Sequence, residues 1–252
     1  MSFNPKRRTW IAIGGGIAVA IAIMVSLAFV LARSPGPGSV QNQNVSSLVF
    51  APDSEPYGRS YADWSALWWE WVASIPANEH PLNDDTGKNC AKNQNDPNVW
   101  FLAGTFGGKA ERTCTIPEGK AILVSPMNVE CNPLQDPEAK TEADLVECVK
   151  SDQDLATGLQ ITVDGVPIEN IEQYRVRSPL FNLTFIQGSI FTGVQPATVR
   201  AISEGFFVML KPLPPGEHVL SSGGAIADPE SGSIDFATEV TWKLTIVERS
   251  NP

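Results

Sequence analysis

Catalytic signatures are sparse in this sequence. It has two histidines in 252 residues, His80 and His218, and it lacks the G-x-S-x-G, H-E-x-x-H and P-loop motifs and the dinucleotide-binding glycine fingerprint. A histidine-based triad or a two-histidine metal site would require His80 and His218 to meet across the fold, and nothing in the pattern brings them together. These absences argue against the enzyme classes that such motifs define.

Acidic residues are missing from the start of the chain. The first 33 residues contain no Asp or Glu and carry four basic side chains, Lys6, Arg7, Arg8 and Arg33. Because the net charge of the whole chain is −10, the remaining residues carry −14 (−10 minus +4). A domain this acidic is unsuited to phosphate backbones and anionic membrane surfaces, so nucleic acid is not an expected partner.

Residues 10–32 form a run of 23 residues without a charged side chain. As a helix this run would be about 35 Å long, enough to cross a hydrocarbon core of about 30 Å. We predict a transmembrane helix preceded by a cytoplasmic basic tail at 1–9, with the rest of this single-pass protein outside the cell membrane. A signal peptide cleaved after Val30-Leu31-Ala32 is the alternative, but its apolar region is normally about 7–15 residues.

Small residues recur at every fourth position within this run, at Gly14, Ala18, Ala22 and Ser26. Such a ladder permits two transmembrane helices to approach closely. A homodimer through the transmembrane helix is therefore one expected interaction, beside the membrane itself and an extracytoplasmic ligand or protein.

Cysteine is scarce, and the four cysteines, Cys90, Cys114, Cys131 and Cys148, all follow the predicted span. None is spaced as C-x-x-C, which argues against a zinc site. An even number of cysteines outside the membrane predicts two disulfides, for which three connectivities exist. Pairing between neighbours closes the shortest loops and favours Cys90–Cys114 and Cys131–Cys148.

Residues 33–56 are rich in Pro, Gly, Ser and Asn, which is typical of a flexible linker, and 57–252 form the extracytoplasmic domain. Asp164-Gly165 predicts a tight hairpin turn. Because short strands occur without a βαβ rhythm, we expect a mainly β fold, an antiparallel β-sandwich of the Ig-like or jelly-roll-like kind with two accessory helices. The predicted strands are 99–106, 112–116, 120–126, 159–163, 174–177, 180–186, 205–211, 217–221 and 240–247.

The first predicted helix covers 60–75. Its apolar residues recur at i, i+3, i+4 and i+7, which indicates a helix with one apolar stripe. Ser60 and Asp63 have the spacing of a capping box, and Pro76 ends the helix.

This helix holds four of the seven tryptophans of the chain. Trp64, Trp68 and Trp71 fall on the apolar stripe, where a helix packs against a sheet. Trp69 leaves the stripe by about 100°. We therefore predict that Trp69 is at least partly exposed, and that it is the one tryptophan of the four able to bind a ligand.

The second predicted helix covers 141–156. Thr141 and Asp144 have capping-box spacing at its start. Its apolar stripe includes Cys148, so this thiol should point inward, where Cys131 could meet it.

Three segments resemble a pattern found in secreted or membrane-anchored microbial proteins of uncharacterised function. They are 57–76 (YGRSYADWSALWWEWVASIP), 99–108 (VWFLAGTFGG) and 114–117 (CTIP). The resemblance covers most of the chain from Tyr57 onward. It implies a secreted or anchored protein and brings no activity with it.

Two kinds of carboxylate chemistry are open to this domain. A glycosidase needs two carboxylates at the right separation, and Asp63 and Glu70, seven residues apart on one face of the first helix, are the pair to inspect first. The alternative is a solvated helix face on which Arg59 pairs with Asp63.

Calcium could bind two acidic loops, although neither has EF-hand spacing. The candidate calcium ligands are Asp84, Asp85, Asp228, Glu230 and Asp235.

The sequence thus predicts a membrane-tethered extracytoplasmic module for binding or structural interaction, without a catalytic constellation and without a cofactor other than calcium. An extracytoplasmic carboxylate-based hydrolase is the alternative. A cleft holding two carboxylates about 5–10 Å apart would favour the hydrolase, whereas an exposed aromatic face would favour binding.

Overall fold

A computed structural model of the protein describes residues 48–248, apart from residues 192 and 194. The predicted cytoplasmic tail, the predicted transmembrane helix at 10–32 and the first part of the predicted linker lie outside these residues. In the part of the chain that the structure describes, no helix is both long and apolar enough to cross a membrane. The membrane span therefore stays a prediction.

The described chain is mainly β, with twelve strands in three sheets and two α-helices. The first sheet has the order β1 (Val99–Phe101), β3 (Ala121–Val124) and β10 (Val208–Leu210). The second has the order β2 (Gly108–Pro117), β12 (Ile234–Val247), β11 (Gly216–Ala227), β5 (Ala156–Val163) and β6 (Val166–Pro167). The third sheet is built on β9 (Ala197–Phe206), with which the three other strands pair. These are β4 (Asn128–Cys131), β7 (Arg175–Arg177) and β8 (Phe181–Phe185).

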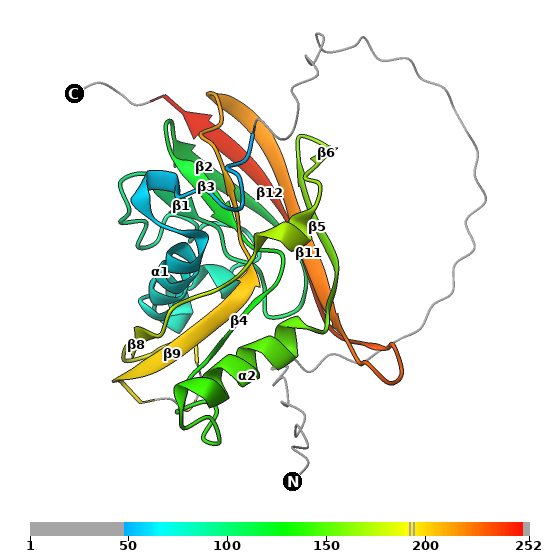
Figure 1. Cartoon of the computed structure of the whole chain (residues 1–252). Coiled ribbons are helices and arrows are strands. Elements are labelled where there is room, and N and C mark those ends of the chain that lie inside the picture. Colours follow the sequence, from blue (N-terminus) through cyan, green and yellow to red (C-terminus); the bar gives the residue numbers. More distant parts are fainter. Residues whose placement is uncertain (1–47, 192, 194, 249–252) are drawn as a thin grey trace, which may run out of the picture. The chain divides into compact units, whose positions relative to one another are not determined.

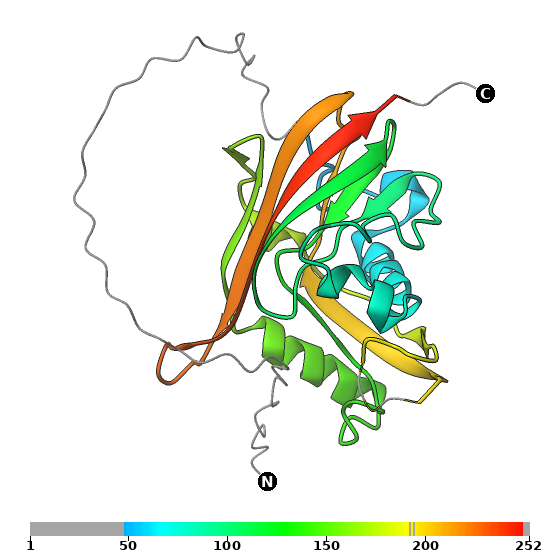
Figure 2. The ribbon, with the colours of Figure 1, turned by 180° about the vertical axis from the view of Figure 1, so that it is seen from behind.

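Helix α1 (Tyr61–Ala73) lies between the first sheet and the third (Figure 1, and from behind in Figure 2). On one side, Trp68 Nε1 donates to the carbonyl oxygen of Leu102, just beyond β1, at 3.0 Å. On the other side, the hydroxyls of Ser65 and Ser203, the latter on β9, lie 3.1 Å apart. Helix α2 (Glu142–Gln153) packs against β4 and β9. Both sheets therefore pack against α1.

Two strand pairings are parallel, so the predicted purely antiparallel sandwich is wrong in this respect. β1 pairs in parallel with β3, and β2 pairs in parallel with β12 from Gly108↔Thr238 onward. Parallel neighbours need a crossover connection rather than a tight hairpin turn, so no local turn signal in the sequence marks these pairings. The mainly β class with two helices is confirmed. An Ig-like or jelly-roll-like sandwich is not established by this mixture of sheets.

Both predicted helices are present, and each begins with the predicted cap. The hydroxyl of Ser60 accepts the N–H of Asp63 at 3.2 Å, while the carboxylate of Asp63 accepts the N–H of Ser60 at 3.2 Å. Thr141 and Asp144 form the same reciprocal pair at the start of α2. These side chains satisfy backbone donors that the first turn of a helix leaves unpaired.

Helix α2 is shorter than predicted. It ends at Gln153 rather than at 156, because Ala156 opens β5 and pairs there with Ile226 of β11. Tertiary pairing with a neighbouring strand thus overrides a helical pattern that could have continued.

Trp69 is buried, which contradicts the prediction that it is exposed. It is 8% exposed, and the centroid of its ring lies 5.1 Å from that of Trp68 and 6.4 Å from that of Phe191. The prediction assumed that one sheet covers α1 from one side. The third sheet covers a second flank of the helix, so within α1 only Asp63 and Glu70 are exposed.

The strand pattern differs from the prediction at several places. β4, β6 and most of β9 are not among the predicted strands. The predicted strand 205–211 is divided between the end of β9 and β10, with Phe207 between them. The predicted hairpin turn is confirmed, because Val163 pairs with Val166 across Asp164-Gly165. Both turn residues have positive φ, +53° and +79°, which is the backbone that an Asp-Gly turn favours.

Two disulfides join the predicted partners. Cys90 is bonded to Cys114, which ties the polar loop after α1 to β2, and Cys131 is bonded to Cys148, which ties β4 to α2. The inward position predicted for Cys148 is thereby confirmed. Neighbour pairing is confirmed, with the bonded cysteines 24 and 17 residues apart along the chain.

Candidate functional site

A shallow hollow lies between the end of α1 and the strand β8. It measures about 310 Å³, within the range of small-molecule sites. We refer to it as the α1–β8 hollow. Its lining residues are Glu70, Ser74, Asn182, Thr184 and Ile186.

The position of each lining residue follows from local sequence. Glu70 belongs to the exposed strip of α1, and Ser74 caps the C-terminus of that helix. β8 alternates buried and exposed residues, so Asn182 and Thr184 face away from the core while its phenylalanines face inward. A helix end and a strand face thus place polar side chains around one space.

Glu70 is the one ionisable residue of the lining. Burial against its neighbours raises the pKa of its carboxyl above the ordinary value, although the side chain still contacts solvent. Among the residues that the structure describes, no side chain forms an ion pair with Glu70 and none donates a hydrogen bond to it. Glu70 is exposed, so its carboxylate is accessible to a ligand from solvent.

The predicted carboxylate pair is not assembled at this site. Asp63 forms the helix cap, where its carboxylate accepts both the backbone N–H and the hydroxyl of Ser60. Asp63 is not among the residues that line the α1–β8 hollow. Arg59 pairs with Asp96 at 3.5 Å rather than with Asp63 as expected for a solvated face. The lining of the α1–β8 hollow therefore holds one carboxylate, whereas a glycosidase needs two.

In the first predicted calcium loop, the buried Asp84 is engaged in hydrogen bonds within the loop. The carboxylate of Asp84 accepts hydrogen bonds from the N–H and hydroxyl of Thr86 and from the N–H of Asn89. Burial alone would raise the pKa of Asp84, but these hydrogen bonds hold it below its ordinary value. Asp85 of the same loop is exposed.

The second predicted calcium loop is closed in the same way. One oxygen of Asp228 accepts the backbone N–H groups of Glu230 and Ser231, and Glu230 and Asp235 are exposed. Within the described ranges, the group of three metal-ligating side chains that lie close together is Cys131, Asp136 and Cys148, and its two thiols are joined in the disulfide. Calcium binding stays a prediction.

The two histidines serve separate structural purposes. His218 contacts Asp164 through Nδ1 at 2.8 Å and the carbonyl oxygen of Pro214 through Nε2 at 3.0 Å. His80 is buried, with Nε2 2.9 Å from the carbonyl oxygen of Val72 and Nδ1 accepting the N–H of Leu82 at 3.1 Å. These two bonds require the neutral ring, with its proton on Nε2.

Acidification should destabilise the fold through His80. Burial lowers the pKa of His80 from 6.5 to about 4, so between these values the unfolded chain binds a proton that the folded chain does not. The stability that the neutral ring contributes is complete above the unfolded pKa and is lost as the pH falls towards the folded one. We expect a loss of about 2–3 kcal/mol between about pH 7 and about pH 4.5.

Urea unfolding of the wild type and of His80→Gln at these two pH values measures this contribution. The wild type should lose more stability than the variant by the amount given, because glutamine does not titrate. Equal losses in the two proteins would show that His80 is not buried in its neutral form.

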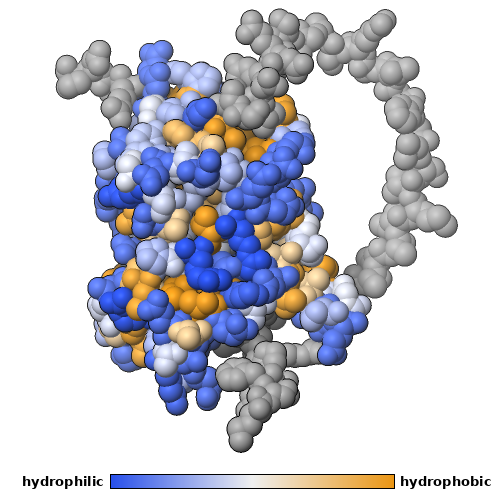
Figure 3. Space-filling model, viewed as in Figure 1, coloured by the Kyte–Doolittle hydropathy of each residue, from blue (hydrophilic) through white to orange (hydrophobic). Residues whose placement is uncertain are grey.

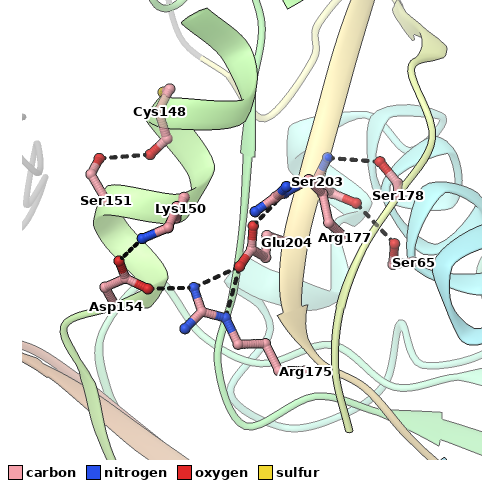
Figure 4. Close-up of polar contacts among 10 residues, drawn as sticks. All are labelled: Ser65, Cys148, Lys150, Ser151, Asp154, Arg175, Arg177, Ser178, Ser203 and Glu204. Atoms are coloured by element: carbon pink, nitrogen blue, oxygen red, sulfur yellow. Dashed lines mark hydrogen bonds and ion pairs between the residues drawn. The ribbon is translucent and has the colours of Figure 1, made fainter. Parts of the chain in front are cut away.

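A second polar cluster joins β7, β9 and α2 (Figure 4). Glu204 of β9 is 3% exposed, and its two oxygens accept the Nε groups of Arg175 and Arg177 at 2.7 Å each. Arg175 continues to Asp154 at 2.8 Å, and Asp154 also pairs with Lys150. Because every acid of the cluster is paired, we assign it to holding the third sheet against α2 rather than to binding.

Apolar surface gives little support for another site. The face in Figure 3 is largely hydrophilic, with its hydrophobic side chains in separate areas. Large hydrophobic residues exposed singly on loops and strands are normal in soluble domains. Those of the described chain are Tyr57, Phe106, Leu134, Val166, Val219, Ile234 and Val247.

Sequence reasoning identified Glu70 but missed the rest of the hollow. Asn182 and Thr184 lie in a strand that was predicted, at 180–186, and their alternation with Phe181, Leu183 and Phe185 marks them as outward-facing. The sequence gives no indication that this outward face of β8 meets the end of α1. That contact joins segments more than a hundred residues apart, for which a single sequence has no signal.

Comparison with known proteins does not assign this chain. No protein-family model and no curated protein sequence matches it. A solved structure, that of the cysteine protease inhibitor EhICP2 from Entamoeba histolytica, is similar over 59% of this chain and 96% of the inhibitor, with 13% sequence identity and a TM-score of 0.23. A likeness at that level carries no argument about fold or function. The resemblance to uncharacterised secreted or anchored proteins stays a prediction.

Proposed function

We propose that this protein is a membrane-tethered extracytoplasmic binding module that holds a small polar ligand in the α1–β8 hollow. The predicted span at 10–32 would anchor it in the cell membrane, with the N-terminus in the cytoplasm. The two disulfides support an extracytoplasmic location, because such bonds persist mainly in oxidising compartments.

One observation carries the binding proposal: the hollow presents polar groups that have no partner within the described chain. Glu70 makes no ion pair there, and no hydrogen bond reaches the carboxamide of Asn182. Both groups can therefore bind a ligand without breaking an internal contact. The single carboxylate favours binding over the two-carboxylate hydrolysis that was the alternative.

Thermal unfolding of the full-length protein in lipid nanodiscs, without sugar-based detergents, tests this proposal. The compounds would be neutral hexoses, polyols, amino sugars and sugar acids. A ligand that binds only the folded protein raises its stability in proportion to the logarithm of its concentration above Kd. We expect at least one of these compounds to raise the melting temperature of the wild type.

Two variants locate the effect. Asn182→Ala removes a lining side chain and should reduce the shift, whereas Asn95→Ala, which changes an exposed asparagine outside the lining, should leave it unchanged. No shift with any compound, or equal shifts in the two variants, would refute binding in the hollow.

A further inference from the structure

The α1–β8 hollow offers more hydrogen-bond acceptors than donors. The hydroxyl of Ser74 already donates to the carbonyl oxygen of Trp71 at 2.7 Å, and its oxygen accepts the side-chain N–H of Asn93 at 3.0 Å. An ionised Glu70 only accepts hydrogen bonds, through two oxygens. Asn182 supplies the one N–H₂ group of the lining and a further acceptor oxygen.

The hydroxyl of Thr184 is also partly committed. It lies 2.9 Å from the hydroxyl of Thr198 on β9, so one of these two protons is used between them. An ordered ligand in the hollow must therefore supply most of the hydrogen-bond donors itself.

The charge of the site points in the same direction. The five lining residues include one carboxylate and no lysine or arginine. The whole chain carries a net charge of −10, and its field favours the approach of cations over anions. An ammonium group is a compact cation with three hydrogen-bond donors. It would balance the charge of the carboxylate and supply donors that the lining lacks.

From this geometry, and on the basis of the binding proposed above, we infer that the ligand is a small hydroxylated amine, such as an amino sugar, whose ammonium group pairs with Glu70. The hydroxyl groups of such a ligand would donate to the free acceptor oxygens of the hollow. The carboxamide of Asn182 can both donate to and accept from a hydroxyl.

Two sugars that differ in one substituent test this inference. D-glucosamine carries an amino group where D-glucose carries a hydroxyl, so the ratio of their dissociation constants reports the ammonium group. Titration calorimetry of the full-length protein in nanodiscs near neutral pH should give at least about fivefold tighter binding of glucosamine. This ratio corresponds to the largest free energies measured for solvent-exposed ion pairs. Added salt should reduce the ratio.

Glu70→Gln removes the charge and keeps the shape of the side chain, so it should abolish the preference for glucosamine. Glu147→Gln, an exposed carboxylate on α2, should retain the preference. Unchanged melting temperatures of both variants would show that they fold alike.

The outcomes separate this inference from the proposed function. Equal binding of the two sugars by the wild type, or a preference that survives in Glu70→Gln, overturns the pairing with Glu70 while the hollow can still bind neutral compounds. Absence of binding by both sugars also overturns the inference. The neutral and acidic compounds of the thermal assay then decide whether the hollow binds any ligand.

Discussion

Replacing Trp68 with alanine is expected to lower the free energy of unfolding by about 3–5 kcal/mol. The ring is 3% exposed and lies within 6.2 Å, between ring centroids, of those of Trp69, Trp71 and Phe207. Its Nε1 donates to the carbonyl oxygen of Leu102, which links α1 to the end of β1. The substitution removes this bond and leaves a cavity in the core.

Trp69→Ala should destabilise the protein by a comparable amount, about 3 kcal/mol or more. The ring of Trp69 is 8% exposed and packs against Phe191, but its Nε1 makes no hydrogen bond in the described chain, so no such bond is lost. Urea unfolding monitored by far-ultraviolet circular dichroism measures both variants, with Glu147→Gln as a surface control. An unchanged stability of Trp69→Ala would show that the third sheet does not cover this flank of α1.

Glu204→Gln is expected to cost about 3 kcal/mol of unfolding free energy, the low end of the range for breaking a buried ion pair. Glu204 is almost fully buried and bonds to two arginines, so the neutral amide weakens two charge-assisted hydrogen bonds at once. The cost should stay at the low end because the side chains of Arg175 and Arg177 are 29% and 38% exposed and remain partly hydrated.

Asp154→Asn provides the matched control for Glu204. Asp154 bonds to the same Arg175, but its side chain is 40% exposed, so its replacement should cost less than about 1 kcal/mol. Chemical unfolding of the two variants under one set of conditions gives the comparison. Similar small effects at both positions would mean that Glu204 is solvated and that the cluster does not hold β7 to β9.

Features that depend on neighbouring residues could be predicted from the sequence. The caps of both helices, the Asp164-Gly165 turn and the two disulfides each follow from residues close together in the chain. Local hydrogen bonds and short loops determine these features, so a single sequence contains the information.

Features that depend on distant contacts could not be predicted. The parallel pairing of β2 with β12 joins segments more than a hundred residues apart, and the burial of Trp69 requires a second sheet on α1. Helical periodicity identified the flank on which Trp69 lies but not what covers that flank. The α1–β8 hollow arises from the same packing, which is why Glu70 could be selected from the sequence while Asn182 could not.

A crystal structure of the protein with the tightest compound of the thermal assay bound tests the central claim most directly. The account predicts electron density for the compound in the α1–β8 hollow, with polar atoms within hydrogen-bond distance of the carboxylate of Glu70 and the carboxamide of Asn182. Density for the compound at another place on the domain, with the hollow holding only solvent, would contradict it.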